Sequence, residues 1–258
     1  TVLAYEKSGE MLHRVSTVFG NLLSAETDDD LQELAKEIMP MMSEHENNIS
    51  LNEELFARIK AVYEQQDKET LSPEQHKLLE DIYNGFVRNG ANLLGEDKEK
   101  YRALCKELSL LTLQFSENNL KETNDYKLVI TDKSQLAGLP ESAVEAAAET
   151  AGEKGVEGWV FTLQAPSYGP FLTYADSRDL RRELYMAYNT KCTHDNASNN
   201  LEIVKKLANV RMEIAQLLGY DNFAEYNLQE RMAQNSESVY KLLDQLLEAY
   251  TPTAKQEY

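Results

Sequence analysis

Apolar residues spaced three and four positions apart, with helix-capping signals between them, constrain the fold of this chain most strongly. The clearest signal, Ser-Pro-Glu-Gln at residues 72–75, combines a capping serine, a proline at the first helical position and a glutamine that can bond back to the cap. The helix that it opens carries apolar residues on one face: Leu78, Leu79, Ile82 and Phe86. Because the same spacing recurs along most of the chain, we predict a mainly α fold.

Other segments carry weaker versions of these signals. The aspartates at 28–30 favour a helix N-terminus because they face the positive end of the helix dipole. Gly95 separates one helix from a long one that we expect over about residues 97–119. Other helix starts are predicted at Ser50 or Asn52, at Ser177 and at Ser236. A polar, solvated loop is predicted over 193–200.

Two short segments interrupt the helical pattern, at 126–131 and 158–163. Both are rich in β-branched and aromatic residues and are bounded by turn residues, so we predict that they pair as strands. Between them Pro140 opens an alanine-rich helix that ends near Gly152 and Gly155. The expected architecture is an irregular multi-helix assembly with a small two-stranded β element.

The charge balance narrows the choice of partners and compartments. A net charge of −18 repels phosphate backbones and anionic lipid headgroups, so we expect no nucleic acid and no membrane partner. No stretch suggests a membrane span, and the first residues lack a signal-peptide pattern. Since the chain begins with Thr rather than Met, the sequence leaves open whether a targeting segment was removed upstream. We expect a cytoplasmic protein, with a periplasmic or exported one as the alternative.

The two cysteines, Cys105 and Cys192, lie far apart and lack the CxxC spacing of metal and redox sites. Cys105 lies beside an apolar helix stripe, so we interpret it as a packing residue. A disulfide between the two cysteines is the less favoured alternative, since disulfide scaffolds are small and cysteine-rich.

Residues 45–49, His-Glu-Asn-Asn-Ile, begin like the zinc-peptidase motif HExxH. In that motif two histidines on one helix face hold the metal, and the glutamate acts as general base on the bound water. Ile49 replaces the second histidine and cannot bind a metal. We therefore interpret this segment as an exposed polar helix end.

A second candidate is Cys-Thr-His-Asp at 192–195, which places a thiol, an imidazole and a carboxylate close together. The pair His194 and Asp195 also resembles ligands of metal-dependent phosphohydrolases. Such a site needs further ligands in a matching setting, and the remaining histidines do not offer one. A solvated loop is the preferred interpretation, and phosphohydrolysis stays a minor alternative.

Aromatic residues gather between positions 168 and 188 and could line a peptide-binding cleft, although core packing is the commoner reason for such a pattern. These residues are Tyr168, Phe171, Tyr174, Tyr185 and Tyr188. No nucleophile elbow, catalytic Cys-His pair or phosphate loop is present in the sequence. The residues alone therefore support a helical scaffold and no self-contained active site.

Residues 158–192, GWVFTLQAPSYGPFLTYADSRDLRRELYMAYNTKC, resemble the passage where the zinc metallopeptidases of the thimet oligopeptidase and dipeptidyl carboxypeptidase type enter their conserved peptidase region. Residues 210–246, VRMEIAQLLGYDNFAEYNLQERMAQNSESVYKLLDQL, are similar to the helices that follow. Residues 5–45, YEKSGEMLHRVSTVFGNLLSAETDDDLQELAKEIMPMMSEH, resemble the family's early helices. The run THDNASNNLEIV at 193–204 looks closer to bacterial dipeptidyl carboxypeptidases, which release C-terminal dipeptides, than to internally cleaving oligopeptidases.

The resemblance implies a helical clamshell around a deep channel that admits short unstructured peptides. It also implies a zinc ion held by HExxH and a later glutamate, none of which has a counterpart here, so we assign no catalytic, cofactor-binding or metal residue. Residues 1–165 would form the N-terminal helical region with its β insertion, and 166–258 the start of the conserved peptidase region, cut off before the zinc motif. We expect a monomeric parent that binds zinc downstream and a fragment inactive alone. The rival interpretation is a standalone helical protein-interaction module without catalysis.

Overall fold

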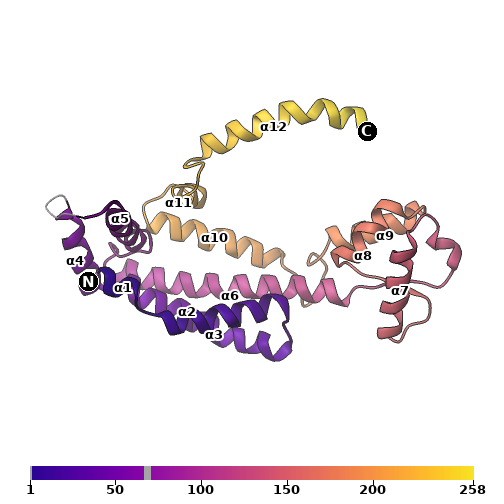
Figure 1. The fold of residues 1–258 in the computed structure, drawn as a ribbon, viewed down its shortest axis with the longest axis horizontal. Coiled ribbons are helices and arrows are strands. Elements are labelled where there is room, and N and C mark those ends of the chain that lie inside the picture. The colour runs from indigo at the N-terminus through magenta and orange to yellow at the C-terminus, as the bar shows by residue number, and fades with distance from the viewer. Residues whose placement is uncertain (1, 67–70) are drawn as a thin grey trace. The chain divides into compact units, whose positions relative to one another are not determined.

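The computed structural model describes residues 2–66 and 71–258 and is mainly helical, as predicted (Figure 1). The chain forms two compact units: unit 1 comprises Thr1–Leu110 and Leu207–Tyr258, and unit 2 comprises Leu111–Lys206. Two helices, α6 (Gly95–Asp125) and α10 (Leu201–Leu217), begin in one unit and end in the other. The sequence-based division at residue 165 concerns the family's conserved region and stays a prediction.

Unit 1 is built from helices, with parts of α6 and α10. Its other elements are α1 (Val2–Glu6), α2 (Glu10–Ala25), α3 (Asp29–Ser50), α4 (Glu53–Tyr63), α5 (Pro73–Arg88), α11 (Phe223–Leu228) and α12 (Ser236–Glu257). A core cluster joins α4 to α5 through Phe56, Ile59, Ile82 and Phe86. The rings of Phe56 and Phe86 stack with centroids 6.1 Å apart, which fixes the contact between the two helices.

The predicted helix starts are confirmed where a side chain caps the backbone. Ser72 Oγ accepts a hydrogen bond from Gln75 N–H, and the Gln75 side chain accepts one from Ser72 N–H, which completes the capping box of α5. Of the two candidates for α4, Asn52 is the cap, because its side chain accepts the N–H of Leu55. Ser177 caps α9 (Arg178–Asn189) in the same way.

Unit 2 contains the predicted sheet, with shorter strands than expected. Its elements are β1 (Leu128–Ile130), the 3₁₀ turn η2 (Lys133–Leu136), α7 (Glu141–Glu153), β2 (Trp159–Phe161), α8 (Ala165–Tyr174) and α9 (Arg178–Asn189). The strands pair antiparallel, with Leu128 opposite Phe161 and Ile130 opposite Trp159. β2 ends early because the N–H of Thr162 donates to Ser167 Oγ instead of to a strand.

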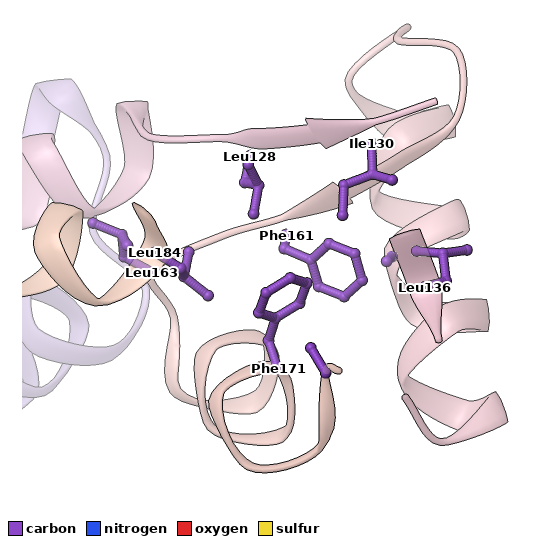
Figure 2. Packing of buried hydrophobic residues seen from close by; sticks show 9 residues of the cluster. Leu128, Ile130, Leu136, Phe161, Leu163, Phe171 and Leu184 are labelled. Atoms are coloured by element: carbon purple, nitrogen blue, oxygen red, sulfur yellow. The ribbon is translucent and has the colours of Figure 1, made fainter. Parts of the chain in front are cut away.

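The core of unit 2 lies between the sheet and the helices α7, α8 and α9. Leu128 and Ile130 point into it, while Val129 between them is exposed, as alternation along a strand requires. Figure 2 shows Phe161 of β2 meeting Phe171 of α8 in this core, with an edge-to-face centroid distance of 4.5 Å. Both rings are buried, and Phe171 is 0% exposed.

The long helix α6 runs to Asp125, beyond the predicted end near 119. Asparagine is unfavourable inside helices and favours caps and turns. In the structure, Asn118 instead donates its side-chain N–H to Asn200, at 2.8 Å. The Asn118 side chain is thus engaged by another segment and does not cap the helix backbone. None of the helices described is long and apolar enough to cross a membrane.

Candidate functional site

The loop between α9 and α10 folds onto the carboxylate of Glu122, near the end of α6. The backbone N–H of Cys192 donates to Glu122 Oε2 at 2.6 Å, and the Asn196 side chain donates to Oε1 at 2.7 Å. Lys191 Nζ donates to Thr123 Oγ1, one residue further along α6. Glu122 therefore clamps the loop, and Cys192 is held in a left-handed conformation with φ 58°.

The environment of Glu122 favours its ionised form. Partial burial opposes ionisation, but the hydrogen bonds from Cys192 and Asn196 and the nearby charges of His194 and Lys191 outweigh it, so the pKa of Glu122 lies below its ordinary value. A carboxylate that accepts two hydrogen bonds in this way stabilises the loop as long as it stays charged.

The prediction of a solvated loop is right for part of this segment and wrong for the rest. His194 and Asp195 are exposed, as expected. Cys192, Ser198 and Asn200 are buried, because Asn200 bonds to the end of α6 and Glu122 draws the loop inward. The polar groups of the loop thus form hydrogen bonds with each other and with α6 rather than with water. No short-range sequence pattern indicates that α6 is the partner.

The pairing of His194 with Asp195 does not extend to a metal site in the part of the chain that the structure describes. His194 Nε2 lies 3.3 Å from Thr190 Oγ1, and both residues line a pocket of about 670 Å³. Across residues 2–66 and 71–258, no three His, Cys, Asp or Glu side chains gather closely enough to hold a metal ion.

Residues 45–49 form the last turns of α3, as a helix end was predicted, but they are not all exposed. His45 and Glu46 face solvent, whereas Asn47 is 7% exposed and Ile49 packs against the α4–α5 cluster. Asn47 turns inward because it hydrogen-bonds to the thiol of Cys105, which confirms Cys105 as a half-buried packing residue. Both cysteines are free thiols.

Cys105 lies in a pocket of about 500 Å³ with Tyr101, and the setting does not activate either group. Burial raises the pKa of the Cys105 thiol and, more strongly, the pKa of the Tyr101 hydroxyl. A thiol nucleophile needs a lowered pKa. The pocket is therefore unsuited to nucleophilic chemistry at neutral pH.

The aromatic residues of α8 and α9 divide between the core and the surface. Phe171 belongs to the core, so the packing interpretation holds for it. Tyr168 and Tyr188 stack with centroids 4.4 Å apart, and Lys191 Nζ lies 4.4 Å from the centroid of the Tyr188 ring. Tyr174 and Tyr185 are about half exposed. Tyr168, Tyr185 and Tyr188 thus form a tyrosine surface that offers apolar rings and polar tips together, and Tyr174 is exposed at the end of α8.

Changing Glu122 to Gln should destabilise unit 2 by about 1 kcal/mol at pH 7, since hydrogen bonds to a partly exposed charged group are lost. Because the folded-state pKa is lowered, this contribution exists above the unfolded value, about 4.3, and is lost as the pH falls through the folded value. Urea unfolding followed by the fluorescence of Trp159, the single tryptophan, measures it. The exposed Glu145→Gln change is the control, and equal midpoints for both variants at pH 7 would contradict the clamp.

Comparison with known proteins bears on all these residues. Residues 171–258 match the family model described as Peptidase family M3. The chain is 34% identical over 258 residues to dipeptidyl carboxypeptidase of Escherichia coli K12, a match that covers 100% of the chain and 38% of that protein. It is 31% identical to oligopeptidase A of Haemophilus influenzae, over 99% of the chain and 38% of the relative. It is 32% identical to the probable cytosolic oligopeptidase A of Arabidopsis thaliana, over 96% of the chain and 36% of the relative.

The chain therefore spans well under half the length of these curated relatives, 36% to 38% in each case. The similarity extends across both units, including the loop on Glu122 and the tyrosine surface, because the alignment with dipeptidyl carboxypeptidase covers the whole chain. The resemblance seen in the sequence is thus confirmed: the chain is similar along its whole length to dipeptidyl carboxypeptidase and oligopeptidase A, and residues 171–258 match Peptidase family M3.

Proposed function

We propose that the chain is the non-catalytic N-terminal part of a zinc metallopeptidase that hydrolyses short peptides. The observation that carries this proposal is the match of the whole chain to 38% of a dipeptidyl carboxypeptidase. A peptidase of that length has room for its metal centre outside the matched part. The chain then supplies scaffold and one wall of the substrate channel.

The described residues do not fit a zinc site. A hydrolytic zinc needs three convergent protein ligands, and its role is to lower the pKa of a bound water so that hydroxide is available at neutral pH. The closest motif ends in Ile49, and no suitable group of ligands occurs within residues 2–66 and 71–258. We therefore assign no step of the hydrolysis to these side chains.

Zinc analysis and peptide hydrolysis test the division of labour. The full-length gene product should contain about one zinc per chain and cleave short peptides, whereas the 258-residue chain should do neither. Elemental mass spectrometry gives the zinc content, and chromatography of a mixed peptide substrate gives the activity. A 258-residue chain that binds zinc and hydrolyses peptides, or a full-length product that does neither, would overturn the proposal.

We further propose release of C-terminal dipeptides as the mode of cleavage, supported by the run at 193–204 and by the match to dipeptidyl carboxypeptidase. Mass spectra from a time course should show peptides shortened by two residues at a time. Internal fragments would instead place the parent with the internally cleaving oligopeptidases. Sedimentation of the same product tests whether it is a monomer, as we propose.

The tyrosine surface of unit 2 supports a role in the channel wall. Tyr174 and Tyr185 present half-exposed rings, which can pack against peptide side chains while their hydroxyls bond to the peptide backbone.

The rival function, a protein-interaction module, predicts a reading frame that ends near residue 258 and contains no HExxH. The cytoplasm is the compartment that we propose, in line with the name of the Arabidopsis relative.

A further inference from the structure

The pocket beside the loop on Glu122 combines apolar surface with charges of both signs. It lies wholly within unit 2, has a volume of about 670 Å³ and takes its walls from the end of α6, the end of α9 and the loop that follows. Leu163, Met186 and Ala187 contribute apolar surface. The charged lining residues are Lys121, Glu122, Asp125 and Lys191, with His194 beside them. Because the formal charges of the two cations and two anions cancel, the pocket favours a ligand that carries both signs itself.

The two anions differ in how available they are to a ligand. Glu122 already accepts a hydrogen bond at each of its oxygens, from Cys192 and from Asn196. Asp125 forms a long ion pair with Lys121, with 3.8 Å between the charged atoms, and its side chain is 68% exposed. An exposed pair of this kind contributes little to stability. Asp125 can therefore exchange Lys121 for a cationic group of a ligand at small cost.

Lys191 is a cation that the fold holds in position. Its Nζ donates to Thr123 Oγ1 at 3.0 Å and lies 4.4 Å from the centroid of the Tyr188 ring. The hydrogen bond to Thr123 uses one of the three donors of the ammonium group. A carboxylate that enters the pocket can accept a charge-assisted hydrogen bond from another of them, and little entropy is lost because the group is already placed.

Tyr126 gives an independent sign of a ligand. Its hydroxyl is buried, and none of the residues that the structure describes offers this group a hydrogen-bond partner, although Tyr126 lines the pocket. Burial, followed by the charge of Glu183, raises the pKa of Tyr126, so the hydroxyl keeps a hydrogen to donate. A buried polar group without a partner costs stability. A ligand that fills the pocket and accepts this hydrogen removes that cost.

We propose that this pocket binds a zwitterionic dipeptide with apolar side chains. The carboxylate of the dipeptide bonds to Lys191, its ammonium group to Asp125 and its peptide carbonyl to the Tyr126 hydroxyl. Its side chains lie against Leu163 and Met186. The volume is in the range of pockets that bind small molecules. That such a dipeptide is a product of the parent enzyme rests on the proposed function, whereas the binding itself does not.

Calorimetric titration of the 258-residue chain with leucyl-leucine tests the inference and should show one site per chain. Lys191→Met and Asp125→Asn should each weaken binding about fivefold or more, because each removes one charge-assisted contact. The controls are Lys154→Met and Asp195→Asn, which change the same residue types at exposed positions of unit 2 outside the pocket lining. Both controls should bind like the unchanged chain, and weakening as large in the controls would overturn the proposed site.

Altered ligands assign each contact. N-acetyl-leucyl-leucine lacks the ammonium group, and the C-terminal amide of leucyl-leucine lacks the carboxylate, so each should bind the unchanged chain about fivefold more weakly. Because the contact is then already lost, Asp125→Asn should not weaken the acetylated ligand further, and Lys191→Met should not weaken the amide further. Equal weakening of all three ligands by these substitutions would overturn the contacts that we propose.

Tyr126→Phe separates ligand binding from folding. Removal of an unpaired buried hydroxyl should leave the midpoint of urea unfolding unchanged or raise it, whereas leucyl-leucine should bind about fivefold more weakly. A lowered midpoint with unchanged binding would contradict the role of the hydroxyl.

The result for the pocket and the result for the proposed function can be told apart. A chain that shows no saturable binding of leucyl-leucine, while the full-length product contains zinc and cleaves peptides, overturns the inference alone. Binding by the chain, when the full-length product neither contains zinc nor cleaves peptides, supports the pocket and overturns the proposed function.

Discussion

Unit 2 should lose about 3–5 kcal/mol of stability when Phe171 is replaced by alanine. The ring is 0% exposed and meets Phe161 edge to face, in the cluster that joins the sheet to α8 and α9 (Figure 2). Truncation removes the buried ring from its contacts and leaves a cavity, because the neighbouring strand and helices cannot close over the space. The loss is comparable with the whole stability of a small domain.

Chemical denaturation followed by Trp159 fluorescence measures this loss, since Trp159 lies in β2 and packs against the same cluster. Tyr185→Ala is the matched control: it also removes an aromatic ring from unit 2, but the ring is 51% exposed and its loss should change stability by no more than about 0.5 kcal/mol. Equal effects of the two substitutions would mean that the cluster around Phe171 does not hold unit 2 together.

Replacing Gly138 with alanine should destabilise unit 2 by more than about 3 kcal/mol. Its φ of +86° disfavours any side chain, and a Cβ atom there would lie 2.2 Å from the carbonyl oxygen of Tyr174 and 2.6 Å from Asp176 Oδ1. The carbonyl cannot withdraw freely, because the neighbouring N–H of Asp176 is bonded to the carbonyl of Ala137. The backbone strain and the steric clash therefore both add to the loss of stability.

Two other glycines separate these contributions. Gly155→Ala has the positive φ without any atom within 4 Å, so strain alone should cost about 1 kcal/mol. Gly152→Ala, in α7, has neither and should stabilise the helix by about 0.5–1 kcal/mol. Thermal or urea unfolding of the three variants should give this order, and a Gly138 variant as stable as the Gly155 variant would show that the close approach is absent in solution.

Local signals were sufficient to predict the elements that local contacts determine. The capping box at Ser72, the caps at Asn52 and Ser177 and the pairing of the two short strands all depend on residues near in sequence or on strand propensity. The ends of elements were less predictable. Side-chain hydrogen bonds that propensity does not consider accompany the extension of α6 and the early end of β2. In α6 the Asn118 side chain donates to Asn200, and after β2 the Ser167 hydroxyl accepts the N–H of Thr162.

The candidate site shows the same division more sharply. The sequence placed His194 and Asp195 correctly in an exposed loop, because a run of polar residues favours one. It could not show that Glu122, 70 residues before Cys192, accepts that residue's N–H, since a single glutamate on a long polar helix face carries no distinguishing pattern. Likewise, the prediction that Asn47 is exposed was wrong because its hydrogen-bond partner, Cys105, lies on another helix.

The Glu122 carboxylate also protects the thiol that lies beside it. Burial, followed by the negative charge of Glu122, raises the pKa of Cys192, so the sulfur stays protonated at neutral pH. Hydrogen peroxide reacts with thiolates far faster than with thiols, and burial raises the pKa of Cys105 as well. Both sulfurs should therefore react more slowly with peroxide than an exposed cysteine of ordinary pKa does.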